Sequence, residues 1–252
     1  RISGSDGFGQ PKFDLKSMQE VMYSDRHFGG ELVRDDLVNL CEIAVKDKGK
    51  KELGEACAVL NDWDLKVNLD SRGAHLFHMF ADAGGLKFKV PFDAADPVYT
   101  PNTLDIADPE VLAALETAVA KLRELDIPLD ARLGDVQAET RNGKRIPIHG
   151  GPGAHGVFNV IHPHDDSLEA EKGWTSIRHG ASWIYAVEFT DNGPKSEGIL
   201  TYSQSTDPTS PHYSDQTELY ARKGWDDLLW ADEAVEANTV SRMMLRSDAH
   251  PD

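Results

Sequence analysis

The stretch Trp183-Ile-Tyr-Ala-Val-Glu-Phe-Thr190 decides the fold class of this chain. Side chains of a β-strand alternate between two faces, so one face of this stretch carries Trp183, Tyr185, Val187 and Phe189. The other face is also largely apolar. A strand that is apolar on both faces is typical of a sheet covered on both sides. The pattern therefore predicts a central strand whose four large residues point into one buried layer.

Further strands are predicted around this segment. The turn sequence Asp191-Asn-Gly-Pro194 predicts a hairpin whose second strand covers residues 198–203. Upstream, Asn142-Gly143 is a tight-turn pair. Three more features are expected there: a strand at residues 144–149, a strand at residues 157–161 and, between them, the glycine-rich loop Gly150–Gly153. The second half of the chain is therefore expected to be rich in antiparallel strands.

The first half is expected to be helical. Asp14 and the pair Asp108-Pro109 are typical helix starts, because aspartate caps free N–H groups and proline fits the first helical position. Ser71 is expected to cap another helix. Runs of helices followed by runs of strands indicate an α+β fold.

Cys41 and Cys57 are the only cysteines, and they lie 57 − 41 = 16 residues apart. Both fall on the apolar stripes of consecutive predicted helices, which are expected to form an antiparallel hairpin. Two cysteines are too few for a disulfide scaffold or a metal knuckle. One bridge and two buried thiols both remain open from the residues alone.

We expect residues 1–252 to form a single unit. It is expected to be helical over residues 14–125, rich in sheet over residues 141–203, and to end in helices and a strand over residues 214–246, with residues 215–230 helical. The chain starts at Arg1, with neither an initiator methionine nor an apolar signal segment after it. This start is expected of a chain that begins after a processing event or is a piece of a longer one.

The net charge of the chain limits the classes of partner that it is expected to bind. The 252 residues include 43 acidic and 26 basic ones, for a formal net charge of −17. This charge argues against nucleic acid and anionic membranes as partners, because both bind cationic surfaces. The longest apolar runs are also far shorter than the roughly 20 residues that cross a bilayer.

Two glycine motifs suggest chemistry but lack the context that it needs. Residues Gly151–Gly156 match G-x-G-x-x-G, but the dinucleotide fingerprint requires a helix after it, where a strand is predicted here. His149-Gly150-Gly151 is similar to the oxyanion loop of lipases, but the chain has no G-x-S-x-G nucleophile motif. Both stretches are therefore interpreted as structural.

Histidines suggest a metal site in two places. His162 and His164 lie beside Asp165 and Asp166, but no distant third ligand is identifiable. His75 and His78 share a helix face without an H-E-x-x-H motif. We therefore expect neither a metal nor another cofactor.

The polar segment Ser203–Gln216 contains serine, histidine and aspartate. Members of a catalytic triad usually converge from separate loops, so their adjacency here is a weak sign of one. Two prolines among Ser, Thr and Asp favour an ordered loop of turns.

Several stretches of the chain resemble the penicillin acylase family, and specifically the C-terminal part of its β subunit. The strongest lie in Trp183–Asp191, Gly198–Gln216 and Lys223-Gly-Trp225, and others are Glu31–Val38, Asp70–Phe77, Pro91–Pro97, Leu133–Gln137 and Arg145–Gly151. Within the family, the chain is most similar in look to aculeacin and echinocandin acylases, acyl-homoserine-lactone acylases and penicillin V acylases. The resemblance runs from about Gly4 to Asn238.

The resemblance implies an N-terminal-nucleophile hydrolase with a four-layer αββα fold. In this family a precursor cuts itself into two subunits, and the new N-terminal serine attacks an acyl amide with its own amine as base. A free α-amine has a pKa near 8, which suits that role. The family's nucleophile, oxyanion donors and acyl-pocket aromatics precede the matched region, so the resemblance places no catalytic residue in this chain.

We therefore expect a structural C-terminal portion of an amidohydrolase, inactive alone. The substrate would be an acyl amide of lipopeptide, acyl-homoserine lactone or penicillin type, and the partners would be an α subunit and the N-terminal β portion. The alternative is a non-catalytic binding or scaffold module. The resemblance also implies an extracellular or periplasmic location and hence a Cys41–Cys57 disulfide. Gly150–Gly153 is expected to border the substrate entrance.

Overall fold

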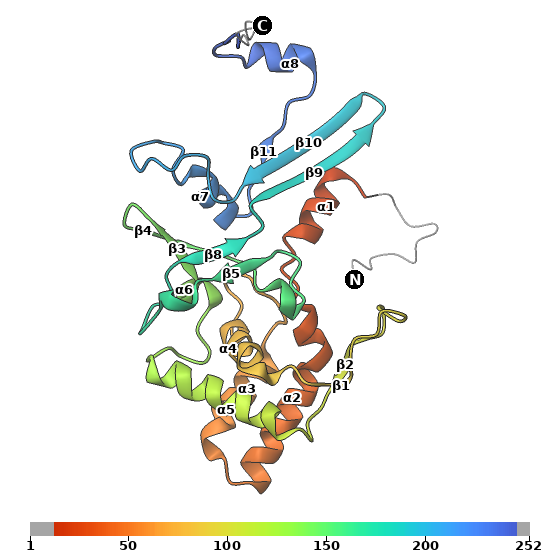
Figure 1. Ribbon diagram of the computed structural model, residues 1–252, viewed down its shortest axis with the longest axis vertical. Helices are drawn as coiled ribbons and strands as arrows, with labels where there is room; N and C mark the ends of the chain where they lie inside the picture. The colour runs from red at the N-terminus through yellow and green to blue at the C-terminus, as the bar shows by residue number, and fades with distance from the viewer. Residues whose placement is uncertain (1–12, 246–252) are drawn as a thin grey trace, which may run out of the picture.

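A computed structural model describes residues 13–245 of the chain (Figure 1). The helical elements of the first half are α1 (Leu15–Met22), α2 (Phe28–Asp47), η1 (Lys51–Leu53), α3 (Gly54–Asp62), α4 (Ala74–Phe80), the π-helical turn η2 (Ala81–Gly85) and α5 (Pro109–Glu124). A two-stranded hairpin of β1 (Phe88–Val90) and β2 (Asn102–Leu104) projects from this helical block. No helix between residues 13 and 245 has the length and apolar composition needed to cross a membrane.

The second half consists mainly of short antiparallel strands. Its elements are α6 (Leu133–Val136), β3 (Ala138–Arg141), β4 (Lys144–Pro147), η3 (Gly153–His155), β5 (Ile161–Pro163), η4 (Asp165–Ser167), β6 (Leu168–Glu169), β7 (Gly173–Trp174), β8 (Ile177–Gly180), β9 (Trp183–Thr190), β10 (Gly193–Leu200), α7 (Asp215–Ala221), β11 (Asp226–Asp227) and α8 (Asp232–Ala237). The named strands pair antiparallel in small sheets, of which β11-β10-β9 is the one with three strands. The predicted α+β class is confirmed.

The helices α2, α3, α4 and α5 enclose the larger apolar core. Among its fully buried side chains are Leu37, Leu53, Leu60, Leu76, Phe77, Phe80, Leu115 and Leu122. Figure 1 shows these helices gathered into one block, with α4 lying among the others. Large apolar side chains at helical spacing on each of them therefore meet in one interior.

Local capping signals set the starts of several helices. Asp14 caps α1 by accepting from the Ser17 N–H at 2.8 Å, as predicted. Asp108 caps α5 in the same way, ahead of Pro109. The prediction for Ser71 is wrong. Helix α4 begins after Gly73, whose φ of 87° is a left-handed conformation that favours glycine.

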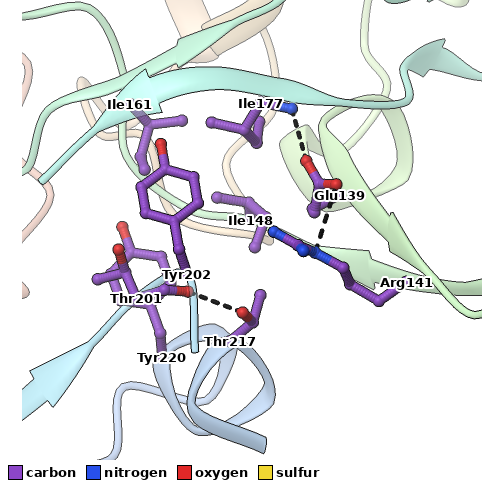
Figure 2. A pocket seen from close by; sticks show the side chains of 9 residues that line it. All are labelled: Glu139, Arg141, Ile148, Ile161, Ile177, Thr201, Tyr202, Thr217 and Tyr220. Carbon is purple, nitrogen blue, oxygen red and sulfur yellow. Dashed lines mark hydrogen bonds and ion pairs between the residues drawn. The ribbon is translucent and has the colours of Figure 1, made fainter. Parts of the chain in front are cut away.

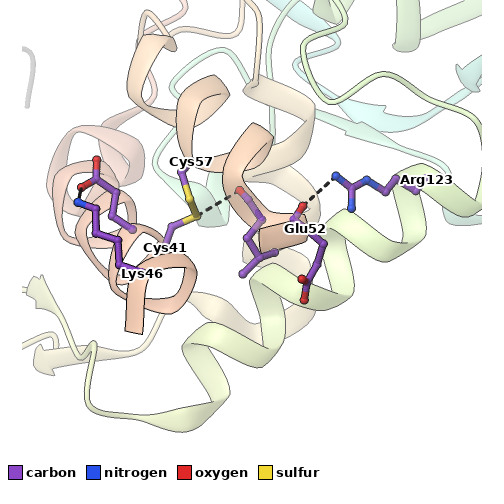
Figure 3. Close-up of a disulfide and its surroundings, with 7 residues drawn as sticks. Cys41, Lys46, Glu52, Cys57 and Arg123 are labelled. Carbon is purple, nitrogen blue, oxygen red and sulfur yellow. Dashed lines mark hydrogen bonds and ion pairs between the residues drawn. A yellow bond between two sulfur atoms is a disulfide. The ribbon is translucent and has the colours of Figure 1, made fainter. Parts of the chain in front are cut away.

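The predicted pair of helices carrying the cysteines is α2 and α3. The structure joins Cys41 and Cys57 in a disulfide (Figure 3). Next to it, the Arg123 guanidinium of α5 donates to the main-chain oxygen of Glu52 at 2.9 Å, which ties α5 to the turn between α2 and α3. The disulfide therefore links α2 to α3, and the Arg123 contact links the turn between them to α5.

Strand β9 lies at one edge of its three-stranded sheet, and its buried face is the opposite of the one predicted. Trp183, Tyr185 and Phe189 are 49%, 59% and 88% exposed. Ile184 and Ala186 on the other face are buried. That face lies toward α1, since the Leu15 N–H is 3.3 Å from the Glu188 carboxylate. We call Trp183, Tyr185 and Phe189 the β9 aromatic face.

Other predicted elements have different bounds in the structure. The strand expected over 144–149 ends at Pro147, and the hairpin strand expected over 198–203 is β10, which covers Gly193–Leu200. A continuous strand over 157–161 does not form, because Val157 pairs with His27 while Val160 pairs with Gly151. Regular pairing starts only at Ile161 in β5. The helix predicted over 215–230 ends at Ala221, because Lys223 adopts a φ of 59° that α-helix does not allow.

A second, smaller core lies beneath the strands. Its buried members are Tyr23, Ile146, Ile148, Ile161, Ile177, Ile184, Ile199 and Tyr220. These residues come from the segment after α1, from five strands or their ends, and from α7. Segments far apart in the sequence therefore meet there.

Candidate functional site

The glycine-rich loop Gly150–Gly153 has little capacity to bind a ligand through its main chain. The N–H of Gly150 donates to the main-chain oxygen of Val67 at 2.9 Å, and that of Gly151 donates to the main-chain oxygen of Asn159 at 3.2 Å. Gly150 has a φ of 103°, and a Cβ there would lie 2.7 Å from the Asn159 oxygen. Because both N–H groups are engaged, neither is free to bind a pyrophosphate or an oxyanion.

The residue before this loop, His149, belongs to a buried polar network. Its Nδ1 lies 2.9 Å from the Asp25 carboxylate, and its Nε2 lies 3.0 Å from the main-chain oxygen of Tyr220. A carbonyl oxygen only accepts, so Nε2 carries a proton. The amide of Asn159 donates to Asp25 at 2.9 Å. All four side chains are buried.

Lys223 completes the network from the other end of the chain. Its ammonium lies 2.8 Å from Asp25, donates to the main-chain oxygen of Tyr23 at 2.7 Å and also donates to Asn68. The phenol of Tyr220 donates to the main-chain oxygen of His149 at 3.0 Å. Two of the stretches that carry the family resemblance therefore meet at the Asp25 carboxylate. Arg145–Gly151 contacts it through His149, and Lys223-Gly-Trp225 contacts it through Lys223.

Burial and charge shape the pKa values in this network. Burial raises the pKa of Asp25, but the contacts from His149 and Lys223 outweigh it and hold that pKa below its usual value. Burial, and then the negative charge of Asp25, raise the pKa of Tyr220 well above its usual value. Asp25 is therefore a carboxylate, and Tyr220 is a neutral hydrogen-bond donor.

The network holds segments together and does not have the geometry of a catalytic pair. A histidine oriented by a carboxylate is the base of many hydrolases. Here Nε2 of His149, the nitrogen that would take a proton from a nucleophile, is hydrogen-bonded to the main-chain oxygen of Tyr220. The ring also stacks on that of Tyr220, with centroids 4.4 Å apart. No substrate proton can reach a nitrogen held in this way.

The serine-rich segment over 203–216 forms local turns. The Ser205 and Ser210 hydroxyls accept from the main-chain N–H groups of Asp207 and His212, both at 3.1 Å. His212 faces Asp215 at 2.8 Å rather than a serine. These contacts match the predicted loop of turns.

A small cavity lies between the strands and α7 (Figure 2). Its walls are Glu139, Arg141, Ile148, Ile161, Ile177, Thr201, Tyr202, Thr217 and Tyr220. Its volume is about 10 Å³, which is room for one water molecule. Glu139 is held at its edge by the Ile177 N–H at 2.8 Å and by Arg141 at 3.5 Å. An acyl chain does not fit in this space.

The histidines chosen from the sequence lie in different surroundings. His75 is buried, with its Nε2 2.9 Å from the main-chain oxygen of Pro128. His162 packs against His179, with ring centroids 4.6 Å apart. His164 is exposed beside Asp166. Neither predicted pair converges on a common point.

A third histidine cluster brings His78 together with Asp82 and His155. The Nε2 of His78 lies 2.9 Å from one oxygen of Asp82, and the Nε2 of His155 lies 3.1 Å from the other. In the described part of the chain, this is the one group of three or more His, Cys, Asp or Glu side chains arranged closely enough to hold a metal ion. Of these three residues, only His78 was a metal-ligand candidate from the sequence. The spacing of four residues between His78 and Asp82 was the available signal, since such residues share a helix face.

Comparison with known proteins identifies the relatives of this chain. The family model for penicillin amidase matches residues 5–237. Aculeacin-A acylase of Actinoplanes utahensis is 42% identical over 248 residues, which cover 96% of this chain and 31% of that protein. The acyl-homoserine lactone acylase PvdQ of Pseudomonas syringae pv. syringae is 30% identical over 94% of this chain and 31% of its own length.

Among solved structures, a thermostable penicillin G acylase from Alcaligenes faecalis matches 96% of this chain and 51% of its own, with a TM-score of 0.45 and 16% identity. The chain spans about a third of the length of the curated relatives that it matches. The family model covers nearly all of the described residues. The chain therefore belongs to the penicillin amidase family.

Proposed function

We propose that this chain is a structural portion of an enzyme that hydrolyses acyl amides, and that the catalytic serine lies on residues outside it. The β9 aromatic face carries this proposal. Three large aromatic side chains on one strand face are at least 49% exposed, although the strand pairs regularly with β10 along its whole length. Exposed apolar surface of this kind marks a site of contact with another protein surface.

The occupant of that face would be the rest of the same enzyme. In a layered fold, an apolar sheet face is covered by a neighbouring layer. The curated relatives, of which this chain spans about 31%, contain enough additional residues to supply one. The proposed companions are an α subunit and the N-terminal part of the β subunit, in the four-layer arrangement that the resemblance implied.

The polar groups of the chain support a structural role. His149 and Asp25 hold segments together, and Ser205 and Ser210 take part in local turns. Amide hydrolysis at neutral pH requires an activated nucleophile, a base and donors aimed at the developing oxyanion. We propose that an N-terminal serine of a companion chain supplies the first two, with its own α-amine as base.

We propose that the substrate is an acyl amide of lipopeptide, acyl-homoserine lactone or penicillin type. The names of the relatives, aculeacin-A acylase and acyl-homoserine lactone acylase, support this class. The acyl chain would bind in the companion portion, where the resemblance places the acyl pocket, and the cavity beside Tyr202, at about 10 Å³, has no room for it. The Cys41–Cys57 disulfide supports an extracellular or periplasmic location, where disulfides persist.

The test is to treat the native, complete enzyme with a serine-directed sulfonyl fluoride and to locate the adduct by mass spectrometry. We expect one adduct per enzyme, on the N-terminal serine of a companion polypeptide, together with loss of acylase activity. The matched control is the Ser205→Ala, Ser210→Ala variant, which should be labelled and inactivated equally. A stoichiometric adduct on any serine of this chain would overturn the proposal.

Intact mass and N-terminal sequencing of the purified protein distinguish the alternative role. A scaffold or binding module would be found without a companion that begins with serine. An acylase portion would be found with one. Hydrolysis of a panel of lipopeptide, acyl-homoserine lactone and penicillin substrates then establishes the acyl group that is preferred.

A further inference from the structure

We propose that His78, Asp82 and His155 form a binding site for a divalent transition-metal ion such as Zn²⁺. This inference goes beyond the proposed hydrolytic function and does not rest on it. The ion would join the end of α4 and the turn η2 to η3, the turn that follows the glycine-rich loop. Its role would be to hold these segments together.

The geometry is close to that of a bound ion. One ligand atom from each of His78, Asp82 and His155 lies within 4.8 Å of the other two. In a tetrahedral zinc site with bonds of about 2.0–2.1 Å, ligand atoms are separated by about 3.4 Å. The two imidazoles already meet the carboxylate at 2.9 and 3.1 Å. The two imidazole nitrogens, which are at most 4.8 Å apart, would need to approach each other by no more than about 1.4 Å to complete three of the four positions.

Packing holds both imidazoles in place. The ring of His78 stacks on the indole of Trp174, with centroids 4.7 Å apart and an angle of 17° between the planes. The ring of His155 lies parallel to that of His27, with centroids 6.2 Å apart. Both ligand histidines are buried. Side chains restrained in this way lose little freedom when an ion binds, which favours affinity.

The backbone around His155 is also held. The Phe28 N–H donates to the main-chain oxygen of Gly156 at 3.2 Å, which fixes the turn against the start of α2. Gly29 permits this close approach, since a Cβ at that position would lie 2.4 Å from the main-chain oxygen of His155. The position of His155 is therefore set by the fold, independently of its contact with Asp82.

The other ring nitrogen of His155 is not a ligand atom of this cluster. Its Nδ1 is buried and has no hydrogen-bond partner within residues 13–245. Asp82 is the one hydrogen-bonding partner found for this imidazole ring in that range, and it faces Nε2. A metal ion bound at Nε2 would add a strong interaction to a ring that otherwise has a single polar contact, and would leave Nδ1 as it is.

Charge at the cluster suits a cation. A carboxylate with two imidazoles is a donor set that selects Zn²⁺ and similar ions over Mg²⁺ and Ca²⁺, which prefer oxygen ligands. The side chain of Asp82 is 46% exposed, so an ion can enter from solvent and keep a water molecule in the fourth position.

To test the site, the complete protein is first stripped of metal with a chelator. It is then titrated with Zn²⁺ in buffer that contains Mg²⁺ and Ca²⁺, and calorimetry measures the binding. We expect one equivalent of Zn²⁺ per chain. The double variant His78→Gln, His155→Gln should bind at least about 100-fold more weakly, since even outer-shell changes cost 10–100-fold. His212→Gln is the matched control, because His212 forms an exposed pair with Asp215 at 2.8 Å. It should bind like the wild type.

A second readout protects the test against a variant that does not fold. Zn²⁺ should raise the melting temperature of the wild type and of His212→Gln but leave that of Asp82→Asn unchanged. Asp82 is half-exposed, so its replacement by an amide of the same size should preserve the fold. The proposal fails if the wild type binds no stoichiometric zinc. It also fails if the double variant or Asp82→Asn binds zinc as tightly as the wild type does.

Discussion

The core enclosed by α2–α5 and the core beneath β4, β5, β8, β9 and β10 are held together in different ways. The first consists mainly of apolar side chains, with the imidazole of His75 buried beside them, and it is crossed by a disulfide and surrounded by helices. The second contains eight buried hydrophobic residues and lies against the charged network of Asp25, His149 and Lys223. Strand β9 contributes Ile184 to this core, while its other side, the β9 aromatic face, is exposed.

This difference separates two ways of stabilising one chain. The helical block is stabilised by apolar side chains that other parts of the same chain bury. The strand region depends on a few charged contacts between distant segments and, as we propose, on a companion that covers its open face. Substitutions in the two regions should therefore differ in size, in pH dependence and in whether they affect folding or assembly.

The largest effect should come from the helical core. Phe77→Ala should lower the free energy of unfolding by about 3–5 kcal/mol, because it leaves a cavity that the neighbouring side chains cannot fill. Phe77 is fully buried and contacts Trp63 with ring centroids 4.9 Å apart. Urea unfolding monitored by circular dichroism measures this loss. Phe92→Ala, at a residue that is 62% exposed, is the control and should cost less than about 0.5 kcal/mol.

Removal of the bridge between α2 and α3 should be the next largest effect. Cys41→Ala with Cys57→Ala should cost about 3 kcal/mol, the chain-entropy value for a loop of this length, since the bridged residues are 16 apart. The measurement is again a urea midpoint, compared with that of the wild type before and after reduction. Reduction should not change the midpoint of the double variant. Two free thiols detected in the denatured, unreduced wild type would contradict this prediction.

A smaller, pH-dependent effect is expected in the strand region. Asp25→Asn should cost about 1.5–3 kcal/mol at neutral pH, because it weakens hydrogen bonds to charged partners. The pKa of Asp25 is lowered in the folded protein. Its contribution is therefore present above the unfolded pKa of about 3.9 and is lost as the pH falls through the folded value.

Unfolding midpoints measured from pH 7 down to pH 2 test this sign. The wild type should lose stability in acid more steeply than Asp25→Asn, so the two curves should converge at low pH. Asp166→Asn, at an exposed carboxylate, should follow the wild-type curve. Parallel curves for wild type and Asp25→Asn would show that Asp25 does not carry this contribution.

The smallest effect on folding should come from the β9 aromatic face. Trp183→Ala, at a residue that is 49% exposed, should lower the free energy of unfolding of this chain by no more than about 0.5 kcal/mol. It should instead reduce the fraction of the chain that co-elutes with its proposed companion in size-exclusion chromatography. A fall in stability as large as that of Phe77→Ala, with assembly unchanged, would show that the face packs within this chain.

Local signals in the sequence were good predictors of structure. Asp14 and Asp108 cap the helices that they were expected to cap, because a cap depends on neighbouring residues alone. Asn142-Gly143 forms its turn, since both residues adopt the positive φ that the pair favours. The stretches that carry the family resemblance also lie within the residues that the family model matches, 5–237.

Predictions that depended on distant contacts were less accurate. The alternation in β9 correctly separated two faces, but which face is covered depends on α1, more than 160 residues earlier in the chain. Helix α4 starts after Gly73 rather than Ser71, because the backbone there is left-handed. His155 could not be grouped with His78 and Asp82 from sequence, since only the folded turn η3 brings them together.

The contact between Lys223 and Tyr23 has a consequence for the order in which the chain folds during synthesis. It joins residues that are 200 positions apart. Every buried member of the helical core has left the ribosome once Val157 has emerged, whereas the second core requires Tyr220. The helices can therefore assemble on the nascent chain while Asp25 still lacks its lysine. The strand region is the part that must wait until Lys223 has emerged, and that a chaperone would have the longest time to bind.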